Sequence, residues 1–207
     1  MPQITHGIRS ILSAPFIYNL FGKLLGEVNG STIFVKESVR PKENDKVLDI
    51  GCGTSNILHY FPKYIEYTGF DANTQYIEAA QKRYSNRATF VCEQINTTNF
   101  TKYSQFDIVL AIGVLHHLDD REALQLFKIA YAALKNGGRL ITMDGVFVEN
   151  QSSIARWIIS KDRGQNVRTQ AGYLELASQV FSNITTDIRH DLLRIPYTHF
   201  ILECTKQ

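Results

Sequence analysis

Two glycines, Gly51 and Gly53, follow the apolar run at residues 47–50 and precede a segment that can begin a helix. A glycine has no Cβ, so the backbone can turn tightly and a ligand can approach it closely. The first N–H groups of a helix have no partner within it and can point toward a ligand. Asp71 follows about 20 residues after such a turn, where a carboxylate can accept hydrogen bonds from ribose hydroxyls. The combination predicts a site for a nucleoside-containing ligand.

A second group of reactive residues follows two later apolar runs. His116 and His117 come shortly after the run at 106–112, and Asp144 ends the run at 139–144. Imidazole gains or loses a proton near neutral pH, and a carboxylate beside it can orient the ring or take the proton itself. The pattern predicts a general base at this place, with His117 preferred over His116; the alternative is that one histidine is structural.

The glycine turn does not fit a dinucleotide-binding fingerprint. That fingerprint is G-x-G-x-x-G, and its third glycine allows close packing of the helix and approach to a pyrophosphate. Here Thr54, Ser55 and Asn56 follow Gly53, so the third glycine is missing. The sequence therefore disfavours a nicotinamide-dependent oxidoreductase.

Strands and helices are expected to alternate from residue 46 onward. Short β-branched and apolar runs predict strands at 46–50, 65–70, 88–92, 106–112 and 139–144, and helical periodicity predicts helices at 54–61, 74–84 and 120–135. Two further helices at 152–160 and 170–181 and two closing strands at 184–191 and 198–205 complete the pattern. Alternation of this kind predicts an α/β fold with a parallel sheet and right-handed crossovers.

The segment Val-Leu-Asp-Ile-Gly-Cys-Gly at 47–53 resembles the first motif of class I S-adenosylmethionine-dependent methyltransferases. Asp71 stands where that family has its ribose-binding acid, and residues 106–118 resemble the fourth strand and its loop. Residues 134–141 resemble the turn before the fifth strand, with Asn136 in place of the usual proline. The resemblance covers residues 45–145. It implies a Rossmann-like, seven-stranded, mostly parallel sheet of order 3-2-1-4-5-7-6, with the last strand antiparallel and helices on both faces.

The resemblance also implies S-adenosylmethionine as cofactor and S-adenosylhomocysteine as product. Asp49 would lie near the methionine amino group, and Ile112 would lie beneath the ligand. The family's acidic residue near the adenine is replaced by Gln94 and Ile95, which can bond the adenine amino group and pack on its face. The expected cofactor residues are Asp49, Gly51, Cys52, Gly53, Asp71, Ala72, Gln94, Ile95, Ile112 and Tyr18.

The two histidines and Asp144 resemble the arrangement in sugar and natural-product O-methyltransferases. This implies O-methylation of a hydroxyl on a small molecule or glycan precursor, with a histidine as general base. An N-methyltransferase acting on a small amine stays open, because a neutral amine needs only alignment. A catalytically idle protein that binds S-adenosylmethionine also stays open. Nucleic-acid adenine methylation is disfavoured because the Asp/Asn-Pro-Pro-aromatic motif is absent after residue 112.

Two arginines in the loop between the helices at 152–160 and 170–181 suggest an acceptor site. Arg163 and Arg168 could bind a phosphate or carboxylate through paired hydrogen bonds, and Tyr173 follows in the next helix. The alternative is a solvated connector.

We expect a single domain over residues 1–207, with a helical lid at 1–40 and a catalytic core at 45–207. The lid would place Tyr18 near the cofactor, although simple core packing explains the same apolar pattern. The net charge of +2 indicates no broad basic face, so no nucleic-acid partner is expected. No apolar run is long enough to span a membrane.

Cys52, Cys92 and Cys204 form no C-x-x-C pair, which indicates neither zinc nor a disulfide framework and favours a cytoplasmic protein with reduced thiols. No metal is expected, because Asp119 and Asp120 are better explained as caps of the helix at 120–135. The oligomeric state is expected to be monomer or homodimer.

Overall fold

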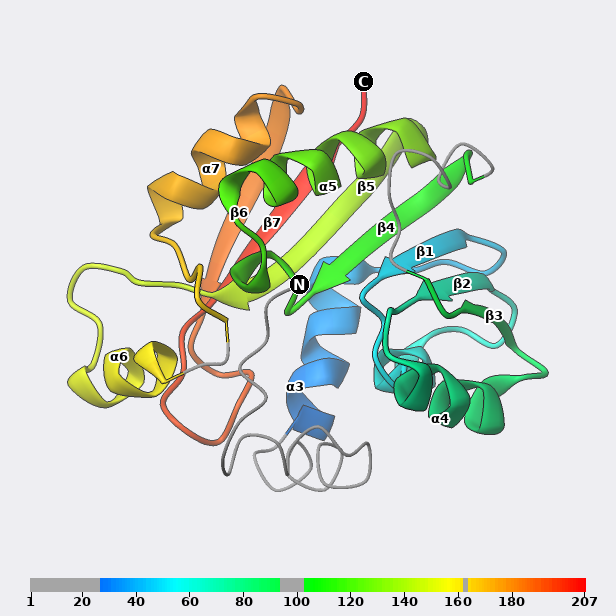
Figure 1. Cartoon of the computed structure of the whole chain (residues 1–207), viewed down its shortest axis with the longest axis horizontal. Helices are drawn as coiled ribbons and strands as arrows, with labels where there is room; N and C mark the ends of the chain where they lie inside the picture. The colour runs from blue at the N-terminus through cyan, green and yellow to red at the C-terminus, as the bar shows by residue number, and fades with distance from the viewer. Residues whose placement is uncertain (1–26, 94–102, 162–163) are drawn as a thin grey trace.

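The computed structural model describes residues 27–93, 103–161 and 164–207. In this part of the chain, strands form a seven-stranded sheet of order β3-β2-β1-β4-β5-β7-β6 (Figure 1). Strands β3, β2, β1, β4 and β5 pair in parallel, and β7 is antiparallel to both β5 and β6. This confirms the expected fold and strand order. The strands are β1 Lys46–Ile50, β2 Glu66–Phe70, β3 Ala88–Val91, β4 Phe106–Ile112, β5 Leu134–Gly145, β6 Asn183–Arg189 and β7 His199–Thr205.

Helices lie on both faces of this sheet (Figure 1). The α-helices are α3 Glu27–Phe34, α4 Thr74–Tyr84, α5 Asp120–Ala133, α6 Ser153–Ser160 and α7 Gln170–Ser178. A π-helix, η1 Val35–Val39, continues α3, and two short 3₁₀-helices are η2 Asn56–Tyr60 and η4 Leu115–His117.

Alternating side chains along the strands build two hydrophobic cores. Leu48 and Val109 belong to the core that also contains residues of α5 and α7. Val47 and Ile108 belong to the second core, which contains residues of α3 and α4. Successive residues of a strand point to opposite faces, so apolar residues at consecutive positions require cover on both sides. The central strands are therefore buried, and their carboxyl ends are held rigidly.

Helix starts follow the local capping chemistry. The side chain of Asn73 accepts hydrogen bonds from the N–H groups of Gln75 and Tyr76, and α4 occupies the predicted range 74–84. Asp119 caps α5 by accepting from the N–H of Glu122, whose side chain in turn accepts from the N–H of Asp119. This reciprocal capping box confirms the predicted capping role of Asp119, while Asp120 is the first residue of the helix.

The helix predicted at 54–61 differs in kind from the observed one. Only the 3₁₀-helix η2 forms there, between Ser55 and Phe61. Ser55 has a left-handed backbone with φ 51°, and Phe61 is extended with φ −86° and ψ 156°. Phe61 precedes Pro62, which disfavours helical backbone at the residue before it. The glycine turn is therefore followed by a single short helical segment.

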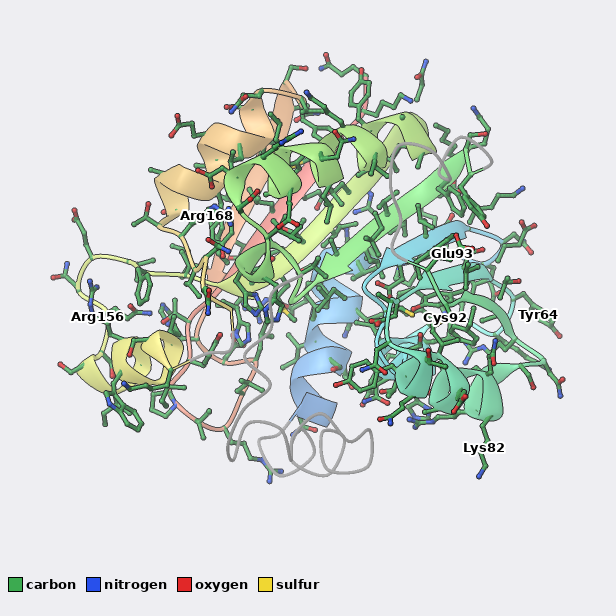
Figure 2. The ribbon with its side chains drawn as sticks, viewed as in Figure 1. Tyr64, Lys82, Cys92, Glu93, Arg156 and Arg168 are labelled. Atoms are coloured by element: carbon green, nitrogen blue, oxygen red, sulfur yellow. The ribbon has the colours of Figure 1, made fainter. Side chains whose placement is uncertain are left out.

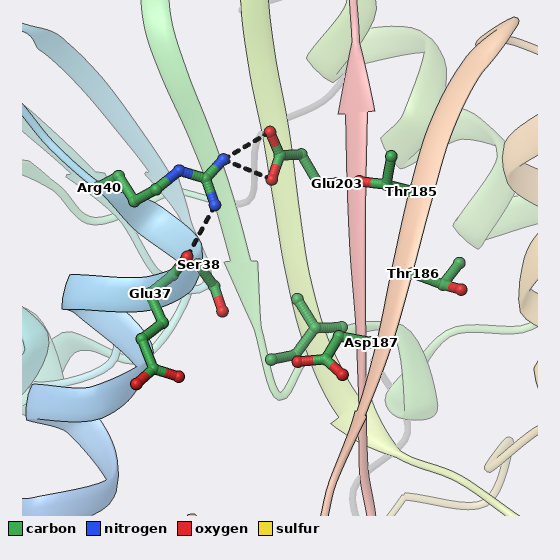
Figure 3. Close-up of a pocket in the computed structure, with 8 residues that line it drawn as sticks. Glu37, Ser38, Arg40, Thr185, Thr186, Asp187 and Glu203 are labelled. Carbon is green, nitrogen blue, oxygen red and sulfur yellow. Dashed lines mark hydrogen bonds and ion pairs between the residues drawn. The ribbon is translucent and has the colours of Figure 1, made fainter.

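One groove lies along β6 and β7, beside η1 (Figure 3). Its lining residues are Glu37, Ser38, Arg40, Thr185, Thr186, Asp187, Ile201 and Glu203. Arg40 donates to both carboxylate oxygens of Glu203, at 2.7 and 2.6 Å, and to the carbonyl of Glu37 at 2.7 Å. Arg40 and Glu203 thus pair within the groove and tie the end of η1 to β7.

Four residues expected at the site, Tyr18, Gln94, Ile95 and Arg163, lie outside the described residues, as does most of the expected lid. Within the described ranges, no helix has the length and apolar character needed to cross a membrane.

Candidate active site

The carboxyl ends of β1, β4 and β5 meet at one edge of the sheet because these strands are parallel and adjacent. The glycine turn follows β1, the histidine pair in η4 follows β4, and Asp144 lies at the end of β5. Open α/β sheets bind ligands at this edge. The glycine turn, the histidine pair and Asp144 are far apart in the sequence and are thus brought to one edge of the sheet.

The glycine turn has a backbone that favours glycine. Gly51 and Gly53 have φ values of +77° and +53°. A Cβ at Gly51 would lie 2.7 Å from Cγ2 of Val114, which precedes η4. At Gly53 no described atom lies within 4 Å of such a Cβ. Gly51 therefore lets the turn pack against the loop after β4, whereas Gly53 leaves open space beside the turn.

Asp71 connects the end of β2 to the glycine turn. Its Oδ2 accepts from the N–H of Gly53 at 3.0 Å, and its Oδ1 accepts from the N–H of Asn73 at 2.8 Å. Partial burial raises the pKa of Asp71, and these two backbone donors offset part of that rise. Ala72, the next residue, is exposed. Each carboxylate oxygen can accept a further hydrogen bond, so Asp71 is fixed in place and can still bind a ligand hydroxyl.

Asp49 is a buried carboxylate on β1 at the same edge. The hydroxyl of Tyr67 on β2 donates to Oδ2 of Asp49 and lies 3.3 Å from Oγ of Ser55. Oδ1 is buried and has no hydrogen-bond partner among the described residues. Burial raises the pKa of Asp49 to about 7, the hydrogen bond from Tyr67 lowers it, and the charge of Asp71 raises it further. The site therefore contains a buried acceptor suited to a cationic group.

Cys52 and Ile112 line the same region. Burial strongly raises the pKa of the Cys52 thiol, and its Sγ would lie 2.8 Å from a Cβ at Gly69. A raised pKa keeps the thiol neutral, so Cys52 has the properties of a small packing residue. Ile112 ends β4, is partly buried and packs against the second core.

His116 and Asp144 form a buried pair. Nδ1 of His116 lies 2.7 Å from Oδ1 of Asp144, and the backbone N–H of His116 donates to the same oxygen at 3.2 Å. The ring of His117 lies 4.1 Å from that of His116, centroid to centroid. Asp144 thus orients His116, whereas the sequence alone favoured His117. A carboxylate that orients an imidazole in this way gives an arrangement that a general base can use.

Arg168 and Tyr173 are engaged with the protein framework. Figure 2 labels Arg168 near the start of α5, where its Nε and Nη2 donate to Oδ1 of Asp120 at 3.0 and 2.7 Å. The buried Tyr173 donates its hydroxyl hydrogen to the carbonyl of Gly145 at 3.0 Å. Contact of either residue with an acceptor stays a prediction.

Comparison with known proteins identifies the family. The sequence model described as "Methyltransferase domain" matches residues 48–140, from β1 into β5. The solved structure of the plantazolicin methyltransferase BamL, in complex with a triazolic desmethylPZN analogue and SAH, is 14% identical with a TM-score of 0.67, and the match covers 98% of this chain and 92% of that one. The chain belongs to the class I S-adenosylmethionine-dependent methyltransferases.

Two curated proteins are similar to this methyltransferase over part of their length. An uncharacterised methyltransferase of Schizosaccharomyces pombe is 33% identical over 91 residues, which cover 38% of this chain and 33% of the relative. The anthranilate N-methyltransferase of Ruta graveolens is 30% identical over 166 residues, which cover 72% of this chain and 43% of the relative. The chain therefore spans less than half the length of either relative.

The residues of this methyltransferase fit the family's cofactor, S-adenosylmethionine. The unpartnered Oδ1 of Asp49 offers a buried acceptor for an ammonium group. The open space at Gly53 allows a ligand to approach the backbone, and Asp71 retains acceptor capacity for hydroxyls. Tyr67 was missed by sequence reasoning, because its position on β2 gives no sign that its hydroxyl reaches Asp49.

Proposed function

We propose that this methyltransferase methylates a hydroxyl group on a small molecule or glycan precursor, with His116 as general base. The observation that supports the proposal best is the buried His116–Asp144 pair at the sheet edge that also carries the glycine turn. S-adenosylmethionine supplies an electrophilic methyl group, and its transfer is an in-line displacement that depends on alignment. A hydroxyl must also lose a proton, which is the task of a base.

The proton path follows from the pairing of His116. Asp144 accepts the Nδ1–H of His116 in the proposed tautomer, which leaves the lone pair on Nε2. Nε2 takes the hydroxyl proton of the acceptor, and Asp144 stabilises the imidazolium that results. The ring of His117 lies against that of His116 in a tilted arrangement and would limit its movement. Because the pair is buried, little water surrounds it, and this would favour transfer of the methyl group to the acceptor over transfer to water.

The cofactor would be held by the residues around the glycine turn. Asp49 would accept from the methionine ammonium, and Asp71 would bind the ribose. Gly51 and Gly53 would allow the cofactor to approach the backbone. Cys52, Ala72 and Ile112 would line the cofactor site. Gln94, Ile95 and Tyr18 are proposed for the adenine and lid contacts, and Arg163 for the acceptor, on the resemblance and the residue types alone.

N-methylation of a small amine is the second candidate. It is favoured by the 30% identity to the anthranilate N-methyltransferase over 72% of this chain. A neutral amine is already nucleophilic, so it needs alignment more than proton removal before attack. A catalytically idle protein would bind the cofactor and transfer nothing.

The test is transfer of label from radiolabelled S-adenosylmethionine into fractionated cell extract, separated into polar metabolites, glycolipid and polysaccharide, protein, and nucleic acid. For O-methylation, His116→Ala and Asp144→Asn are expected to lower the rate by about 10²- to 10⁴-fold while the Kd for S-adenosylhomocysteine stays within about twofold. His59→Ala serves as control, because His59 is exposed on η2. A rate that survives His116→Ala would favour N-methylation, and no label with cofactor binding intact would favour an idle protein.

A further inference from the structure

The segment at 164–168, between α6 and α7, packs directly against the histidine pair. The N–H of Asn166 donates to the carbonyl of His116 at 3.0 Å. A Cβ at Gly164 would lie 2.0 Å from Cδ2 of His116 and 2.5 Å from its carbonyl oxygen. Gly164 therefore brings its backbone against the imidazole at a distance that no other residue type permits.

Arg168 holds the same histidines indirectly, through hydrogen bonds to the backbone carbonyls of the residues on either side of them. Its Nη1 donates to the carbonyl of Leu115 at 2.9 Å, and its Nη2 donates to the carbonyl of Leu118 at 2.8 Å. These two carbonyls flank His116 and His117 on either side. The guanidinium also binds Asp120 at the first turn of α5, and its side chain is 10% exposed. One planar group thus links η4, α5 and the segment before α7.

Asp144, at the end of β5, also holds η4. Its Oδ1 accepts from the backbone N–H of His116 and lies beside Nδ1 of the same residue. The histidine pair is therefore held both by β5 and by the 164–168 segment. A base must lie within hydrogen-bond reach of the proton it takes, and a misplacement of about 1 Å can lower a rate by about 10²-fold.

We propose that Arg168 and Gly164 are positioning residues that set the place of His116 for proton transfer. This rests on the proposed function. Arg168 then acts through the backbone carbonyls of η4 and does not bind the charge of an acceptor. Lysine keeps the positive charge but has no planar fork of donors, so it cannot replace Arg168 in this role.

The first experiment compares Arg168→Lys and Arg168→Ala with Arg189→Lys. Arg189 is a fair control because its side chain is 14% exposed and its ion pairs are with Glu37 and Asp191, neither of which contacts η4 in the bonds described above. With the acceptor fraction identified by label transfer, both Arg168 variants are expected to lose about ten- to hundredfold in kcat. Acceptor KM and the Kd for S-adenosylhomocysteine should stay within about twofold, and Arg189→Lys should keep its kcat.

The opposite results would overturn the proposal. An unchanged kcat in Arg168→Lys would show that positioning does not depend on the fork. A raised acceptor KM in Arg168→Ala that lysine restores would make Arg168 an acceptor ligand.

A second measurement does not need an acceptor. Nuclear magnetic resonance of the protein labelled with ¹⁵N-histidine follows the ring of His116. Arg168→Lys and Gly164→Ala are expected to shift the ring signals of His116, whereas Arg189→Lys is not. Unshifted signals in Arg168→Lys would refute the positioning role, and this variant decides if Gly164→Ala fails to fold. If the wild type labels no fraction, the proposed function fails while these spectra still decide whether Arg168 places His116.

Discussion

At the scale of single residues, the edge of the sheet that carries the glycine turn holds a buried carboxylate, Asp49, with a hydrogen-bond partner among the described residues for only one of its two oxygens. Asp49 accepts from Tyr67 through one oxygen, and its other oxygen has no hydrogen-bond partner in the described part of the chain. Burial outweighs the hydrogen bond and raises the pKa of Asp49 to about 7. A bound ammonium group would reverse this balance, because an adjacent positive charge favours the ionised form.

Cofactor binding is therefore expected to depend on pH through Asp49. Below pH 7 the carboxyl is protonated in the free protein, so binding of an ammonium requires release of a proton. The affinity for S-adenosylhomocysteine is expected to fall by up to about tenfold for each pH unit below 7. Calorimetry in two buffers of different ionisation enthalpy measures both the affinity and the proton release. Asp49→Asn should bind weakly with no such dependence, and an equal wild-type affinity at pH 6 and pH 8 would contradict the assignment.

The two glycines of the turn should respond differently to alanine. Gly51→Ala adds both backbone strain at positive φ and a contact with Val114 that is too short, so it is expected to lower the free energy of unfolding by about 2–4 kcal/mol. Gly53→Ala adds strain alone and should cost about 1 kcal/mol. Denaturant unfolding compares the two variants. Both should weaken cofactor binding, and equal unfolding energies would show that the Val114 contact relaxes freely.

At the scale of elements, short helical segments carry the site. η2 follows the glycine turn and ends before Pro62, and η4 places the histidines after β4. Isolated segments of this length are not stable in water, so they depend on their neighbours. The cap of α5 lies directly after η4 and fixes where the helix begins.

Removal of that cap should cost stability without affecting cofactor binding. Asp119→Ala leaves the N–H of Glu122 without its acceptor and is expected to lower the free energy of unfolding by about 1 kcal/mol. Asn73→Ala removes the equivalent cap of α4 and should cost a similar amount. Urea unfolding and calorimetry with S-adenosylhomocysteine check both points. A loss of cofactor affinity in Asp119→Ala would mean that the cap also shapes the cofactor site.

At the scale of the whole molecule, two cores and an ion-pair network around Glu203 hold the sheet between its helices. Glu203 on β7 accepts from Arg40, which follows η1 (Figure 3). It also accepts from Arg139 on β5. Arg139 also donates to the carbonyl of Val39 in η1. The network joins the N-terminal helical segment to two strands. Cytoplasmic location and the choice between monomer and homodimer stay predictions.

Glu203 should make stability depend on pH in the acidic range. Burial alone would raise the pKa of Glu203, but the hydrogen bonds from Arg40 and Arg139 outweigh it and lower the pKa below the ordinary value of 4.5. The stabilisation is therefore present above pH 4.5 and is lost as pH falls through the lower, folded-state value. Glu203→Gln should reduce the free energy of unfolding at pH 7, and the difference from wild type should shrink toward pH 3.5.

Urea unfolding at several pH values measures this difference. Glu66→Gln is the control, because Glu66 forms an exposed pair with Lys46 that contributes little. A difference that stays constant down to pH 3.5 would mean that the Glu203 network does not stabilise the fold through its charge.

The sequence by itself determined the sheet, the glycine turn, the cap of α5 by Asp119 and the family resemblance. Each of these depends on residues close together in the chain, such as Asp119 and Glu122 or the alternation along β4, and local backbone chemistry is the same wherever the segment lies. Pro62 indicates that the helix after the glycine turn must be short, but the helical periodicity at 54–61 led to the prediction of a full helix.

The tertiary structure alone decided which groups meet. Asp144 reaches His116 across 28 residues, and Arg168 reaches Leu118 across 50. Tyr67 likewise meets Asp49 only because β2 pairs with β1. Side-chain partners of this kind are set by how the strands and loops pack, and a residue type and its place in the sequence do not specify that packing. For this reason the sequence could name the histidines, the carboxylate and the arginine, whereas only the fold assigned the carboxylate to His116 and the arginine to the backbone that carries it.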